Sequence, residues 1–149
     1  MKKKLDLLKR ILRFKELLEE RTKIMVYNAK INYQKLLEEK KLIEEEYKDC
    51  INYLQEKRNF SAEDLKSWLF YLNTLLEFRE IADNKVKVQE RILEELKEEL
   101  KKRNMEKRVM ERFTEKITLQ YNLSKWKKEI KELDEIILLR KGRNLEESL

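Results

Sequence analysis

The sequence has one glycine, no proline and no histidine among its 149 residues. Glycine and proline form most tight turns, so a chain almost without them can reverse direction only once or twice and must consist of few, long elements. Without histidine, hydrolytic triads, zinc sites and acid–base chemistry near neutral pH lose their usual agent. A single glycine cannot form a phosphate-binding loop. These absences predict a protein that is not an enzyme and holds no metal or other cofactor.

Cysteine and long apolar runs are also scarce. Cys50 is the single cysteine, so a disulfide framework is excluded and a reducing compartment such as the cytosol is favoured. No run approaches the roughly 18 uncharged apolar residues of a membrane-spanning helix. The first residues are too highly charged for the apolar core of a secretory leader. We therefore expect a cytoplasmic protein with no direct insertion into a membrane.

The residues that are abundant are charged and aliphatic. Charged residues make up 44% of the chain and hydrophobic residues 41%, interleaved at short spacing. This is too apolar for a disordered chain and is typical of a long helix or coiled coil. The predicted fold class is all-α: two long helices form an antiparallel coiled-coil hairpin, with the second helix longer. We expect a single domain over 1–149, with helices at about 3–57 and 62–141, a turn at 58–61 and a frayed tail at 142–149.

Apolar side chains predict which face each helix turns toward its partner. Along the first helix they recur at steps of four, three and four, close to an eleven-residue repeat, and then at heptad spacing. The predicted stripe of the first helix is Leu7, Ile11, Phe14, Leu18, Thr22, Met25, Ala29, Tyr33, Leu36, Lys40, Ile43, Tyr47, Cys50 and Leu54. The predicted stripe of the second helix is Leu65, Trp68, Leu72, Leu75, Arg79, Ala82, Val86, Gln89, Leu93, Leu96, Leu100, Arg103, Lys107 and Met110, then Phe113 and Ile117, and, after a change of phase, Leu123, Trp126, Ile130, Leu133 and Ile137. Antiparallel pairing is expected to place Leu54 opposite Leu65 and Leu18 opposite Leu100.

The helix ends have their own signals. Ser61 can cap the first turn of the second helix, where Glu63 and Asp64 favour the positive end of the helix dipole. Asn59 is the predicted left-handed residue that ends the first helix. Gly142 is the predicted C-terminal cap of the second helix.

Two surfaces stand out from the two-helix pattern. Residues 68–81 are apolar nearly all round the helix, more than one partner helix can cover, which predicts an exposed docking patch near the turn or contact with a second copy. Basic residues dominate 1–15, with seven against one acidic, and 101–128, with ten against three. They could form a solvated face or bind an acidic protein cavity or a polyanion. Nucleic acid is the weaker choice, because the chain offers no base-stacking platform or groove-reading module.

Four segments carry a resemblance to a known family. They are the opening Leu12–Arg21, the restart Ser61–Leu65, the following Tyr71–Leu75 and the late Lys131–Glu135. In order and spacing the chain resembles the FliJ family of flagellar export proteins, the coiled-coil stalks of the type III export ATPase. It departs from many members in lacking a glycine-rich reversal before the second helix.

The resemblance implies a function and partners. It implies a stalk whose terminal end inserts into the hexameric export ATPase, promotes its assembly, couples it to the export gate and escorts export chaperones. It implies a location peripheral to the inner membrane, where the cytoplasmic region of the gate protein is the partner. The residues carried over for gate binding are Tyr71, Leu75, Phe78 and Ala82. The residues expected to face the ATPase ring are Lys9, Arg10, Arg13, Phe14, Arg112, Trp126 and Lys127.

Other functions fit parts of the same pattern. The equivalent stalk of a virulence-type injectisome has a similar pattern. A structural or chaperone-type coiled coil that assembles as a dimer or tetramer would also need long amphipathic helices. Nucleic-acid binding through the basic segments is a third hypothesis, and it predicts salt-sensitive binding.

Overall fold

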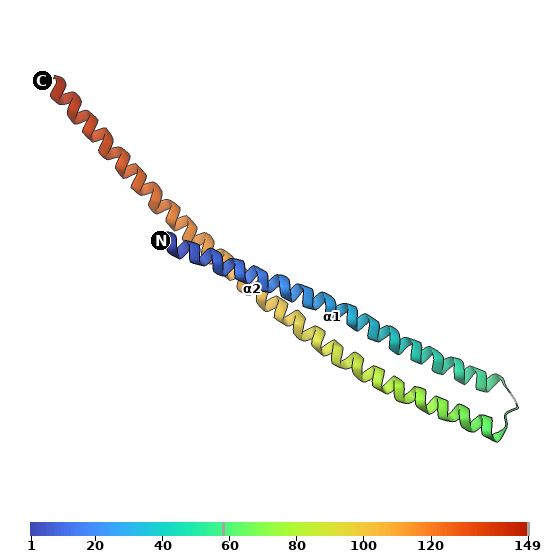
Figure 1. Ribbon diagram of the computed structural model, residues 1–149. Coiled ribbons are helices and arrows are strands. Elements are labelled where there is room, and N and C mark those ends of the chain that lie inside the picture. Colours follow the sequence, from blue (N-terminus) through green and yellow to red (C-terminus); the bar gives the residue numbers. More distant parts are fainter. Residues whose placement is uncertain (58, 149) are drawn as a thin grey trace. The chain divides into compact units, whose positions relative to one another are not determined.

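The computed structural model describes residues 1–57 and 59–148, so Arg58 of the predicted turn and Leu149 of the predicted tail lie outside it. The described residues form two helices, α1 (Lys2–Glu56) and α2 (Ala62–Ser148), and no strand (Figure 1). The two helices pack against each other in opposite directions. The predicted all-α hairpin with a longer second helix is therefore confirmed.

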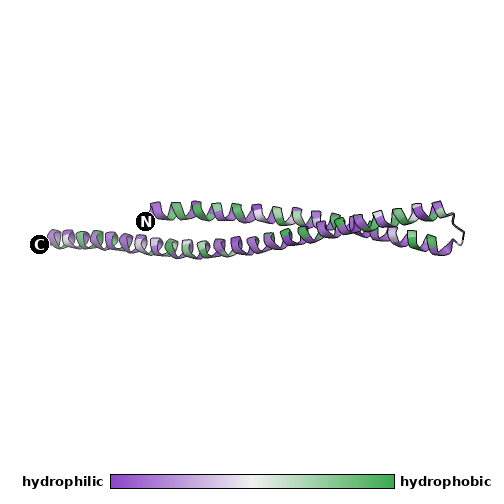
Figure 2. Ribbon diagram, turned by 90° about the horizontal axis from the view of Figure 1, so that it is seen from below, coloured by the Kyte–Doolittle hydropathy of each residue, from purple (hydrophilic) through white to green (hydrophobic). Residues whose placement is uncertain are grey.

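Contacts between the helices divide the chain into two compact units, each with a segment of both helices. The terminal unit comprises Met1–Glu19 and Arg103–Leu149, and the loop unit comprises Glu20–Lys102. Figure 2 shows polar and apolar residues alternating along both helices, as expected where one face of each helix packs and the other meets water.

The packed face of α1 follows one uninterrupted heptad pattern. Its buried and half-buried members are Leu5, Leu8, Leu12, Lys15, Glu19, Thr22, Val26, Ala29, Tyr33, Leu36, Lys40, Ile43, Tyr47, Cys50 and Leu54. The predicted eleven-residue repeat is wrong: Leu7 and Met25 are exposed, and Phe14 is 58% exposed. Three packed positions of α1 are polar: Lys15, Glu19 and Thr22. A prediction that follows apolar residues alone therefore selects residues on the neighbouring, exposed side of the helix.

The packed face of α2 follows the same alternation of three and four residues. Its buried and half-buried members are Trp68, Leu72, Leu75, Ala82, Val86, Gln89, Leu93, Leu96, Leu100, Arg103, Lys107, Met110, Thr114, Ile117 and Tyr121. Arg79 is in phase but exposed, and Thr114 takes the buried place predicted for Phe113. From residue 122 to residue 147 every side chain is exposed. This C-terminal extension of α2 has no part of α1 beside it.

The register between the helices differs from the expected one by about one helical turn. Tyr53 packs on Trp68, with ring centroids 5.1 Å apart, and Leu65 is exposed instead of facing Leu54. Glu19, in place of Leu18, meets α2 near Asn104. Leu54 and Leu65 both lie inside their helices, so the difference lies in how the helices pair and not in where they end.

The start of α2 is as predicted. The Ser61 hydroxyl accepts a hydrogen bond from the Asp64 N–H at 3.1 Å, and the Ser61 carbonyl accepts one from Leu65 at 3.0 Å. Glu63 and Asp64 lie in the first turn, at the positive end of the helix dipole. Ser61 is thus the N-cap.

The predicted conformations of Asn59 and Gly142 are wrong. None of the described residues has a positive φ, so Asn59 is not left-handed. Because α1 already ends at Glu56, Asn59 belongs to the connection and not to the helix end. Gly142 lies inside α2, which continues to Ser148 rather than ending near 141. One glycine costs a helix only about 1 kcal/mol, too little to end one whose neighbours are good helix formers.

Each unit has its own small core. In the terminal unit Leu5 and Leu8 pack on Ile117, with Met110 and Tyr121 against them. In the loop unit the cluster consists of Val26, Ala29 and Leu93, with Tyr33, Leu96 and Leu100 packed on it.

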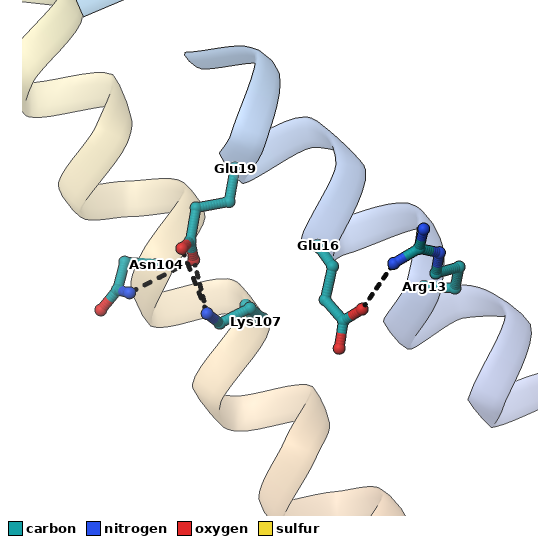
Figure 3. Close-up of polar contacts among 5 residues, drawn as sticks. All are labelled: Arg13, Glu16, Glu19, Asn104 and Lys107. Atoms are coloured by element: carbon teal, nitrogen blue, oxygen red, sulfur yellow. Dashed lines mark hydrogen bonds and ion pairs between the residues drawn. The ribbon is translucent and has the colours of Figure 1, made fainter. Parts of the chain in front are cut away.

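A polar layer interrupts the packed face in the terminal unit (Figure 3). Glu19, only 3% exposed, accepts hydrogen bonds from the Asn104 amide at 3.2 Å and the Lys107 ammonium at 3.1 Å. Nearby, Lys15 forms an ion pair with Glu106 at 3.1 Å. Such a layer is satisfied in only one register, so it selects the pairing of the helices at little gain in stability.

Candidate protein-docking surfaces

One flank of α2 in the loop unit carries a second row of apolar residues, parallel to the packed face. They recur at steps of three and four, interrupted by Thr74 and Lys85. We call this row the docking flank: Tyr71, Phe78, Ile81, Val88 and Ile92. All five are exposed, Phe78 by 52%. An apolar row at this spacing, beside a packed face, is suited to pack against one further helix.

The four residues expected at the export gate divide between two places. Tyr71 and Phe78 lie on the docking flank, where a partner can reach them. Leu75 and Ala82 lie in the packed face against α1, and Leu75 is only 4% exposed. Leu75 and Ala82 therefore pack α2 against α1, which leaves Tyr71 and Phe78 exposed on the docking flank.

The exposed apolar surface predicted around residues 68–81 is present. Leu69 and Leu76 are exposed on the other flank of α2, and Phe70 points away from α1. Val88 and Ile92 extend the surface beyond the predicted segment, and sequence analysis missed them. Their three-and-four spacing from Phe78 and Ile81 was the signal that could have found them.

The residues expected to face an ATPase ring all belong to the terminal unit. Lys9, Arg10, Arg13 and Phe14 are exposed on α1, and Arg13 pairs with Glu16 at 3.3 Å (Figure 3). Arg112 is exposed on the paired part of α2.

Trp126 and Lys127 lie farther along, on the C-terminal extension. The seven residues are therefore spread over α1, the paired part of α2 and the C-terminal extension.

A further apolar row begins at Leu119 and runs along the C-terminal extension. Six consecutive positions at steps of four and three are apolar and exposed, and we call them the terminal stripe: Leu119, Leu123, Trp126, Ile130, Leu133 and Ile137. This row is two residues out of phase with the packed face that ends at Tyr121. It therefore turns away from the face that α2 presents to α1, and a partner must cover it from another side.

The described residues contain neither a metal-holding cluster nor a membrane-spanning helix. No group of three or more histidine, cysteine or acidic residues among them could hold a metal ion. No helix in the same ranges is long and apolar enough to cross a membrane. Exposed apolar rows on long helices are features of protein–protein contact.

A comparison with protein-family models decides among the classes of coiled coil. The model described as Flagellar FliJ protein matches residues 4–146, nearly the whole chain. The chain belongs to the FliJ family. The FliJ family is associated with flagellar export and is not a family of known enzymes. Neither the curated proteins nor the solved structures yielded a match.

Proposed function

We propose that this FliJ-family protein is the central stalk of the flagellar type III export ATPase. Its terminal unit enters the hexameric ring and promotes ring assembly. The observation that carries this proposal is the C-terminal extension, a long helix whose apolar row is exposed and not packed on α1. Exposed apolar rows of this length mark a protein interface.

The distribution of charge also favours the terminal unit as the part that contacts the ring. The basic side chains Lys9, Arg10, Arg13, Arg112 and Lys127 are exposed around the terminal unit. They would meet acidic groups lining a ring and steer the stalk toward it. Phe14 and Trp126 would add apolar contact there.

The loop unit has the second role in the proposal. Tyr71 and Phe78 contact the cytoplasmic region of the export-gate membrane protein, and Leu75 and Ala82 hold them in place. Export chaperones are further partners of the stalk. The protein works in the cytoplasm, peripheral to the inner membrane at the export apparatus. The family description names the flagellum, which favours this system over an injectisome.

The test uses the full chain and the cognate export ATPase. Wild-type protein is expected to raise hexamer formation and ATP turnover. Trp126→Glu with Leu133→Glu should reduce this stimulation roughly tenfold, because both charges fall in the terminal stripe. Neither position packs on α1, so the melting temperature should stay unchanged.

Ser124→Glu is the matched control, because it adds a charge to the same extension on another face. It should stimulate like wild type. If wild-type protein at saturating concentration leaves both hexamer formation and turnover unchanged, the stalk proposal is refuted.

A further inference from the structure

The loop unit has a hollow at the end of the docking flank nearest the turn. It has a volume of about 520 Å³ and is lined by side chains of both helices: Glu46, Asp49, Cys50, Tyr53, Ser67, Trp68 and Tyr71. Three of these are aromatic and two are carboxylates. Aromatic faces beside carboxylates are the chemistry that recognises an organic cation.

The aromatic rings form one connected cluster. Trp68 packs at a tilt on Tyr53, with centroids 5.1 Å apart, and edge-on against Tyr71 at 6.1 Å. The cluster already attracts a cation of its own chain, because the Lys57 ammonium lies 5.6 Å from the centroid of the Tyr53 ring and 5.3 Å from that of Phe60.

Among residues 1–57 and 59–148, no lysine or arginine forms an ion pair with the two carboxylates of the hollow, Glu46 and Asp49. The Tyr71 hydroxyl donates a hydrogen bond to the Glu46 carboxylate, which fixes that carboxylate at the wall and raises the pKa of Tyr71. Burial, and then the charge of Glu46, raise the pKa of the Cys50 thiol at the base. The thiol therefore stays neutral and adds no charge of its own.

We propose that this hollow receives an arginine side chain from an amphipathic helix of the export-gate partner, while the apolar face of that helix covers the docking flank. A guanidinium is flat, stacks on aromatic faces and donates to two carboxylates at once, so it fits this lining better than a compact ammonium. This inference rests on the proposed function, because it specifies how the gate would bind.

Spacing along α2 specifies the partner further. Tyr71 at the hollow and Phe78 on the flank are two helical turns apart, roughly 10 Å. A helix lying along the flank therefore carries its arginine about seven residues from its first apolar anchor. Further apolar residues follow at steps of three and four to match Ile81, Val88 and Ile92.

The experiment measures binding of the full chain to the cytoplasmic region of the cognate gate protein by calorimetry. Glu46→Gln with Asp49→Asn should weaken binding roughly tenfold and flatten its dependence on salt. The side-chain amide introduced by Glu46→Gln can still accept the Tyr71 hydrogen bond, and circular dichroism verifies the fold. Glu38→Gln with Glu45→Gln removes the same charge from exposed positions of α1 outside the hollow, and should change affinity less than twofold.

The partner's arginine is found by replacing each arginine of the gate region with glutamine. One replacement should weaken wild-type binding about tenfold yet have little further effect on the Glu46→Gln, Asp49→Asn variant. That non-additivity identifies the arginine in the hollow.

The other outcomes overturn the inference in distinguishable ways. If the hollow variant binds like wild type while Phe78→Ala loses binding, the arginine contact is refuted and the proposed gate function stands. If wild-type protein does not bind the gate region, gate function and inference fail together. If sedimentation shows a dimer that the hollow variant abolishes, the occupant is a second copy of this chain.

Discussion

The two units use the same two-helix geometry with different residues at its centre. Each unit has a small apolar cluster, and the terminal unit in addition buries Glu19 against Asn104 and Lys107. Apolar packing supplies stability, and a buried polar layer supplies register at a cost. Pairing in the terminal unit therefore depends on a buried carboxylate as well as on apolar packing.

Among the polar contacts, the largest effect we expect comes from breaking the polar layer. Glu19→Ala leaves the Lys107 and Asn104 donors without their acceptor and should lower the free energy of unfolding by about 2 kcal/mol. Chemical denaturation followed by circular dichroism measures it.

A double variant tests the reason for this loss. Glu19→Leu with Lys107→Leu removes both charges and should restore most of the stability, because replacing a whole buried pair with apolar residues is close to neutral. If both variants lost the same free energy of unfolding, the unpaired donors of the polar layer would not be the cause of the loss.

A smaller, pH-dependent effect belongs to the loop unit. The ammonium of Lys40, 2.9 Å from Asp83, and then that of Lys87 hold the pKa of the Asp83 carboxyl below its usual value of 3.8. A lowered pKa in the folded state stabilises the protein above pH 3.8, and this stabilisation is lost as the pH falls through the folded pKa.

Thermal melts of wild type and Asp83→Asn measure the effect. Wild type should melt slightly higher at about pH 6, and the two should converge at the lowest pH at which the protein remains folded. A constant difference at every pH would exclude the Lys40–Asp83 pair as the cause.

The smallest expected effect lies on the C-terminal extension. Gly142 is helical with open space where a Cβ would lie, so Gly142→Ala should add about 0.5–1 kcal/mol to local helix stability. Hydrogen exchange of the amides near residue 142 should slow, while exchange in the two cores stays the same. Faster exchange would contradict a helix that continues through this residue.

Local features of the fold could be predicted from the sequence. The scarcity of turn formers limited the chain to two helices, and Ser61 with Glu63 and Asp64 marked the start of the second. These signals act within one helical turn, so one sequence is enough to interpret them.

The phase of the packed face could not be predicted from apolarity alone. Lys15, Glu19 and Thr22 are polar residues at packed positions, and Lys15 and Glu19 find partners on the other helix. Without knowledge of those partners, Leu7 and Phe14 were better candidates, and both are exposed.

The candidate site could be predicted only in part, because its apolar residues are visible in the sequence and its register is not. An excess of apolar residues near 68–81 indicated a docking surface, and the family resemblance selected three residues within it and the adjacent Ala82. Their division between surface and packed face needs the true register, which the sequence analysis had shifted by about one turn. The hollow at Glu46 and Asp49 joins residues of two helices, so no single stretch of sequence reveals it.

The most direct test of the central claim, that partners bind outside the packed face, compares Phe78→Ala with Leu75→Ala. For each variant the melting temperature and the affinity for the cytoplasmic region of the gate are measured. Phe78→Ala should lose about tenfold in affinity with an unchanged melting temperature, and Leu75→Ala should melt several degrees lower. A Phe78→Ala variant that melts as low as Leu75→Ala and binds like wild type would contradict the claim.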